Sequence, residues 1–186
     1  MALPKYTVPS LTPKEGAEVA AILQQRLDAL NDLALTLKHV HWNVVGPHFI
    51  AVHEMLDPQV DAVRLMVDAI AERIATLGVA PVGTPGALVA NRTWEDYSLG
   101  RDSAIAHLGA LDVVYIGVIE NHRQAAKDVE EVDDVTNDLL IGHLHELELF
   151  HWFVRAHLES AGGVLTTGNA QSEKTAARKA SVKDNA

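Results

Sequence analysis

Apolar residues recur along most of the chain at the three- and four-residue spacing that is typical of amphipathic helices. The first run opens at Thr12-Pro13-Lys14-Glu15, a capping box with proline at the first helical position, and its apolar stripe continues to about Asn43. A second run extends from about Phe49 to Leu77, where Gly78 ends it. Pro58 lies inside the second run and is expected to kink that helix, because proline removes one backbone donor.

Two further helical runs follow a stretch that is rich in glycine and proline. Residues 78–93 show no periodicity and are expected to form a loop. The third run extends from about Arg101 to Val132, and the fourth from about Val135 to Ser160. No strand-like alternation of any length appears. The pattern therefore predicts an all-α ferritin-like four-helix bundle with a long crossover connection between helices 2 and 3.

Composition fits one domain that needs no disulfide to fold. The chain has 186 residues, 48% of them apolar, and no cysteine. The absence of cysteine excludes disulfides, thiolate zinc sites and iron–sulfur clusters. We expect an N-terminal arm at 1–11, the bundle at 12–163 and a flexible basic tail at 164–186.

Charge is spread unevenly along the chain. The net charge is −10, with −12 on residues 1–172 and +2 on residues 173–186. Val182 is the only apolar residue larger than alanine in the last 14 positions, so this tail is expected to be flexible. It is either a merely solvated terminus or a basic arm that binds DNA phosphates. Its candidate DNA-binding residues are Lys174, Arg178, Lys179 and Lys183.

No signal peptide or membrane span is expected. The first ten residues contain two prolines and no long apolar run. We therefore expect a cytoplasmic protein with no membrane partner.

Histidines and carboxylates gather between residues 41 and 72. Ten histidines occur in the chain, and isolated ones such as His107, His122 and His157 indicate nothing by themselves. The dense group is different because its members repeat at helical spacing. It comprises His41, His53, Asp57, Asp68 and Glu72.

Spacing brings part of this group together within one chain. His53 and Asp57 are four residues apart on one helix face, and His41 and His53 lie six residues to either side of Pro47. In a hairpin that turns at Pro47, the two imidazoles face each other. Asp68 lies roughly 22 Å further along the second helix, too far to share a metal ion with His53. Asp68 and Glu72 are then either ordinary surface acids or ligands that complete a neighbouring subunit's site across a two-fold axis.

These residues resemble the signature of the Dps family, DNA-binding proteins from starved cells within the ferritin-like superfamily. The resemblance rests on the pair His41-Trp42, the GPHFIAVHEMLD run at 46–57 and the DAIAER segment that holds Asp68 and Glu72. It covers about 32 residues densely, and the helix layout agrees over nearly the whole bundle.

The resemblance implies a hollow homododecamer that oxidises iron(II), with hydrogen peroxide as the preferred oxidant, and stores ferric mineral. Catalytic iron ligands would be His41, His53 and Asp57 from one subunit, with Asp68 and Glu72 from its partner. Asp57 is the least secure of these ligands, because the residue before a proline tends to leave helical geometry. The resemblance also implies a nucleoid-associated stress protein that binds and condenses DNA without sequence preference.

Two further features carry alternative interpretations. Trp42 either lies beside the iron site and intercepts stray oxidising equivalents, or it is a core aromatic residue. Acidic residues near the start of the fourth helix, above all Asp134 and Asp138, either line an iron-entry pore at a three-fold axis or face solvent.

Two rival functions remain open at this stage. The first is a bacterioferritin-type protein with a di-iron site inside each bundle, for which Glu148 and His151 supply only half of the ligand set. The second is a non-enzymatic, DNA-compacting helical shell whose histidines are structural.

Overall fold

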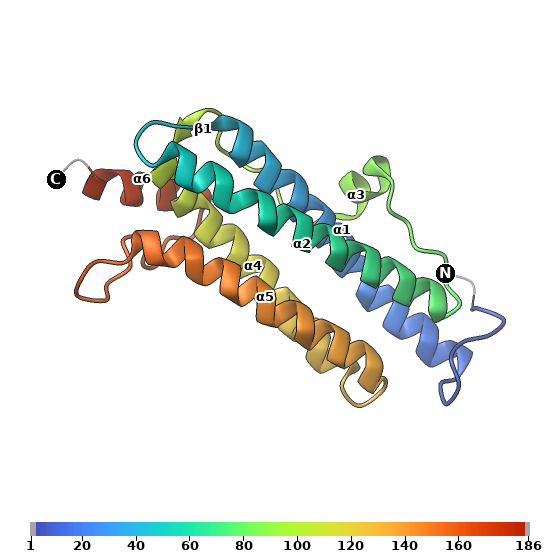
Figure 1. The fold of residues 1–186 in the computed structure, drawn as a ribbon. Coiled ribbons are helices and arrows are strands. Elements are labelled where there is room, and N and C mark those ends of the chain that lie inside the picture. The colour runs from blue at the N-terminus through green and yellow to red at the C-terminus, as the bar shows by residue number, and fades with distance from the viewer. Residues whose placement is uncertain (1–2, 185–186) are drawn as a thin grey trace.

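The computed structural model describes residues 3–184, with the side chains of residues 183 and 184 left outside the description. Four long helices form two antiparallel pairs, as Figure 1 shows. The first pair is α1 (Pro13–Asn43) with α2 (Phe49–Thr76), and the second is α4 (Ala104–Val129) with α5 (Asp134–Leu158). The predicted bundle and its crossover are confirmed, with boundaries within a few residues of those expected.

Local signals in the sequence explain where α1 and α2 begin and end. Thr12 accepts from the backbone N–H of Glu15, and the Glu15 carboxylate accepts from the Thr12 N–H, so the predicted capping box is present. Gly78 ends α2 with a positive φ, and a side chain there would collide with the carbonyl oxygen of Tyr6. α2 continues through Pro58 as one helix, so Asp57 keeps its helical position.

The crossover is more ordered than the sequence predicted. It contains a short helix, α3 (Pro85–Asn91), and it ends in strand β2 (Asp102–Ser103), which pairs in parallel with β1 (Val44–Val45). The side chain of Gln24 on α1 bonds to both backbone groups of Val82 and fixes the start of the crossover. The prediction of a plain loop at 78–93 was wrong because a seven-residue helix is too short to show a periodicity.

The prediction of a flexible tail also differs from the structure. Residues Glu173–Asp184 form helix α6, which packs against α4 with Ala176, Ala177 and Ala180 buried. Gly109 of α4 lets the helices approach closely, since a Cβ there would lie 2.7 Å from the Ala176 carbonyl oxygen. The buried alanines pack against Gly109 and hold this segment in place. The prediction of a flexible tail counted only apolar residues larger than alanine and so missed this contact.

The bundle core is aliphatic and centres on α4. Tyr115 and a series of leucines and isoleucines are fully buried between the two helix pairs. Of the described helices, α4 alone has the length and mean hydropathy of a membrane span. It is the helix that both α5 and α6 cover, and 56% of that apolar stretch is buried inside the protein.

Candidate metal centre

The turn between α1 and α2 places the two histidines of the motif face to face. His41 lies in the last turn of α1 and His53 in the second turn of α2, with β1 and a tight turn between them. Gly46 and His48 both have positive φ, at 85° and 64°, which reverses the chain in a few residues. The imidazole rings stack with their centroids 3.6 Å apart and an interplanar angle of 22°.

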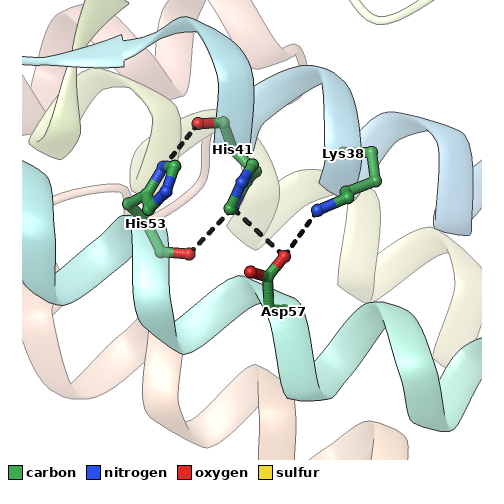
Figure 2. Close-up of polar contacts among 4 residues, drawn as sticks. All are labelled: Lys38, His41, His53 and Asp57. Carbon is green, nitrogen blue, oxygen red and sulfur yellow. Dashed lines mark hydrogen bonds and ion pairs between the residues drawn. The ribbon is translucent and has the colours of Figure 1, made fainter.

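Each of these histidines is held by the backbone of the other. The Nδ1 atom of His41 lies 2.9 Å from the carbonyl oxygen of His53, and the Nδ1 atom of His53 lies 2.9 Å from the carbonyl oxygen of His41 (Figure 2). Because a carbonyl oxygen can only accept, each Nδ1 carries the proton. In the neutral rings both Nε2 atoms then retain a lone pair, which is the arrangement that a metal-binding histidine requires.

Asp57 joins the two imidazoles from the next turn of α2. Its Oδ1 atom lies 3.2 Å from Nδ1 of His41 and 2.6 Å from the Lys38 ammonium. The hydrogen bond from Lys38 is the main cause that lowers the pKa of the Asp57 carboxyl, so this group is an anion at neutral pH. His41, His53 and Asp57 therefore lie together, as the spacing predicted.

Lys38 is a member of this cluster that the sequence reasoning missed. It lies nine residues before Pro47, while Asp57 lies ten residues after it, so the argument that paired His41 with His53 could also have found it. Its ammonium is half-buried and occupies one side of the carboxylate that a metal ion would use.

The two remaining predicted ligands lie elsewhere on the same chain. Asp68 and Glu72 are exposed on α2, about four helical turns from His53. Among residues 3–184 no three histidine or carboxylate side chains converge closely enough to hold a metal ion. A complete site of imidazoles and several carboxylates would therefore need a second copy of the chain.

The residues proposed for an intra-bundle di-iron site are engaged in other contacts. His151 bonds through Nε2 to Asp112 at 2.7 Å, and Glu148 forms an ion pair with Arg123. Thr167 donates to the other oxygen of Asp112 at 2.6 Å, so this buried group ties the segment after α5 to α4. The arrangement favours a structural role for His151.

Comparison with known proteins identifies the family. A model of the ferritin-like domain matches residues 20–162. The DNA protection during starvation protein of Mycolicibacterium smegmatis is 60% identical over 175 residues, which cover 94% of this chain and 96% of that protein. The chain belongs to the Dps family of ferritin-like proteins.

Relatives of known structure agree with this assignment to the Dps family. DpsA14 from Streptomyces coelicolor superimposes with a TM-score of 0.87 at 65% identity, over 89% of this chain and 99% of that one. A structure of Mycobacterium smegmatis Dps gives a TM-score of 0.88 at 58% identity, over 92% of this chain and 98% of that one. A third relative, the fine tangled pili major subunit of Haemophilus ducreyi, is 52% identical over 85% of this chain and 84% of its own length.

Trp42 lies on the surface of this Dps-family subunit. Its side chain is 71% exposed, so the interpretation as a core aromatic residue is wrong. It directly follows His41 at the end of α1, and the exposed Phe49 of α2 lies with its ring centroid 5.0 Å from that of His53. Large aromatic side chains thus stand exposed around the histidine pair, as expected where another protein surface covers them.

The remaining predicted residues lie at opposite ends of the subunit. Asp134 and Asp138 are exposed in the first turns of α5, beside Asp133, which is buried and paired with Arg73 at 2.6 Å. On α6, Lys174 and Arg178 are exposed one turn apart, whereas Lys179 is half-buried and donates to the Gly168 carbonyl at 2.8 Å. The side chain of Lys183 lies outside the described residues.

Proposed function

We propose that this protein is a ferroxidase that takes up iron(II) as its substrate, oxidises it with hydrogen peroxide and stores the ferric product inside a hollow dodecamer. Two iron(II) ions each give one electron to the peroxide, whose O–O bond breaks. With two protons, the products are two iron(III) ions and two water molecules. The same shell binds and protects DNA.

The reciprocal hydrogen bonding of His41 and His53 is the observation that supports this proposal. It engages both Nδ1 atoms, so that the two Nε2 lone pairs are left available, while the Asp57 carboxylate lies 3.2 Å from Nδ1 of His41. Imidazole nitrogen and carboxylate oxygen together suit iron(II), and the carboxylates also suit the harder iron(III). The bonds hold the rings before any ion arrives, so binding requires little reorganisation.

A second subunit would complete the site, because the carboxylates of Asp68 and Glu72 lie far from the histidine pair on the same chain. Asp68 and Glu72 of a two-fold-related copy would supply the additional carboxylates, and the symmetry would create two sites at once. Asp134 and Asp138 would line an acidic entry channel at a three-fold axis and attract cations. Trp42, exposed beside His41, would intercept oxidising equivalents that leave the site.

DNA binding would use α6 as a docked helix. Lys174 and Arg178 are exposed one turn apart on α6 and offer positive charge to phosphates, which the acidic bundle repels. A single copy offers few charges, but twelve copies on one shell act together, and linked weak sites gain roughly 10²–10⁴ in avidity.

Mixing two inactive variants tests whether the iron site is shared between subunits. One variant carries His41→Ala and His53→Ala, and the other Asp68→Asn and Glu72→Gln. We expect each alone to lose most of its iron(II)-dependent peroxide consumption. Shells co-assembled from equal amounts of both should regain about a quarter of the wild-type sites, because one subunit of a pair can supply the histidines and the other the acids.

Native mass measurement on the same samples controls for assembly. Wild-type rates in either variant would exclude these residues from the reaction. Two inactive variants that stay inactive in mixed shells of correct mass would place each site within a single subunit.

A further inference from the structure

Three buried side chains from three helices form a polar cluster inside the bundle, away from the candidate iron site. They are Arg26 of α1, His122 of α4 and His143 of α5, with exposed fractions of 7%, 0% and 8%. The two imidazole rings lie with their centroids 5.7 Å apart. Most buried side chains of the bundle are aliphatic, so these three belong to a small set of polar groups in its interior.

Four buried polar atoms of this cluster have no hydrogen-bond partner within the described chain. These atoms are Nη1 of Arg26, both ring nitrogens of His122 and Nδ1 of His143. Buried donors and acceptors are nearly always satisfied, and an unpaired buried charge is the most costly case. Four such atoms from three neighbouring side chains indicate that something other than these residues satisfies them.

Arg26 is a buried cation for which the described residues provide no counter-ion. Burial is the cause that lowers its pKa, and no carboxylate in residues 3–184 forms an ion pair with it. The half-buried Arg92, by contrast, pairs with both Asp32 and Asp96. Arg26 therefore lacks the negatively charged partner that Arg92 has.

The imidazoles beside Arg26 are neutral donors. Burial lowers the pKa of His122 to about 3, with His143 and Arg26 as further causes, and burial lowers the pKa of His143 to about 4. Each ring therefore offers one N–H at neutral pH, next to the N–H groups of a guanidinium. A metal cation would be repelled by Arg26 and would find no carboxylate here, so the charge pattern favours an anion.

We propose that Arg26, His122 and His143 form an internal binding site for a small inorganic anion of halide size. The anion neutralises the guanidinium and accepts hydrogen bonds from all three side chains. It thereby joins α1, α4 and α5 in the middle of the bundle. The site is independent of iron chemistry.

A cavity gives this site a route to solvent. Arg26 forms part of the wall of a cavity of about 470 Å³ between α1, α4 and the crossover. Four carboxylates also line it: Arg92 pairs with Asp32 and Asp96, Glu173 accepts from the Ser98 backbone N–H, and Glu95 is the fourth. The cavity leads to the guanidinium of Arg26, while His122 and His143 lie behind it and do not line the wall.

Bromide provides a direct test on the wild-type protein. Crystals grown in sodium bromide should show an anomalous difference peak between Arg26 and the two histidines. In solution, replacement of sodium gluconate by sodium bromide at constant ionic strength should raise the Tm. Each tenfold increase in bromide above the Kd should add roughly 3–6 °C for a chain of this length.

Two arginine variants give the matched comparison. Arg26→Met should remove both the anomalous peak and the bromide dependence of the Tm, whereas Arg123→Met should keep both, because Arg123 pairs with Glu148 and does not line the cavity. The proposal is overturned if wild-type crystals show only water at the cluster, or if bromide raises the Tm of Arg26→Met as much as that of the wild type. If Arg26→Met does not fold, the wild-type peak and the bromide dependence decide the question.

Discussion

A lysine and a histidine contact the same carboxylate oxygen of Asp57, and this arrangement decides how freely Asp57 can accept a metal ion. The Lys38 ammonium is 2.6 Å from Oδ1, the same oxygen that faces His41. A cation already present on a carboxylate competes with any divalent ion that uses it. Lys38 therefore holds Asp57 in place and at the same time weakens its binding to a metal.

Replacement of Lys38 by methionine should strengthen binding of a divalent ion at this site. We expect the Kd for cobalt(II), read from its visible absorption, to fall about two- to fivefold, the range for a partly exposed ion pair. Lys14→Met is the matched control, because Lys14 pairs with exposed Glu18 at the far end of α1. A higher Kd in Lys38→Met would mean that positioning of Asp57 outweighs competition.

At the residue scale the sequence predicted neighbours but not their environment. Spacing around Pro47 was enough to bring His41, His53 and Asp57 together, because a hairpin of two helices has few geometries. The burial of His122 beside another imidazole and a guanidinium could not be predicted. These neighbours, Arg26 of α1 and His143 of α5, come beside it only when the helices pack.

α6 is a docked helix where the sequence predicted a flexible arm, and this changes how its basic residues can meet DNA. A flexible basic arm reaches DNA in any direction, whereas a docked helix presents Lys174 and Arg178 on one face. The helix is fixed at its start, where Glu173 accepts from the Ser98 backbone N–H at 2.7 Å, and along its length by Gly109 of α4.

Charge reversal on α6 should weaken DNA binding by the assembled shell. In Lys174→Glu/Arg178→Glu we expect retardation of duplex DNA to require at least tenfold more protein, because every copy loses its phosphate contacts together. Lys5→Glu/Lys14→Glu makes the same charge change on the N-terminal arm and at the start of α1, and it should have little effect. A chain truncated after Ser172 should match the α6 variant.

The salt dependence of DNA binding also distinguishes the wild-type shell from the α6 variant. Wild-type binding should weaken steeply as salt is raised, and the residual binding of the α6 variant should depend on salt much less. Equal retardation by the wild type and the truncated shell would exclude α6 as the DNA-binding element.

Stability of the whole molecule should fall in mildly acidic solution because the core holds neutral histidines. Burial lowers the pKa of His122 and His143 in the folded state, whereas in the unfolded chain histidine titrates near 6.5. Below that pH the unfolded state takes up protons that the folded state cannot accept. In halide-free buffer we expect the free energy of unfolding to fall by about 2.5 kcal/mol between neutral pH and about pH 5.5, and to be nearly flat above pH 7.

Variants without these imidazoles isolate the effect. His122→Gln and His143→Gln should each reduce the fall in Tm between about pH 6.5 and 5, followed by circular dichroism, and the double variant should flatten it. The structural carboxylates Asp112 and Asp133 have lowered pKa values and lose their charge only in more acidic solution. A wild-type Tm that does not change over this interval would show that the two rings are protonated in the fold.

The sequence by itself determined the four long helices, their crossover and the local group of His41, His53 and Asp57. These features depend on periodicity, caps and spacing within one hairpin, which are short-range properties of the chain. The tertiary structure alone decided the docking of α6 on α4, the ordered helix and strand in the crossover, and the exposure of Trp42. It also decided the burial of Arg26 beside two histidines without a counter-ion among the described residues. Each of these depends on which surfaces meet when distant helices pack, and no pattern within a single helix contains that information.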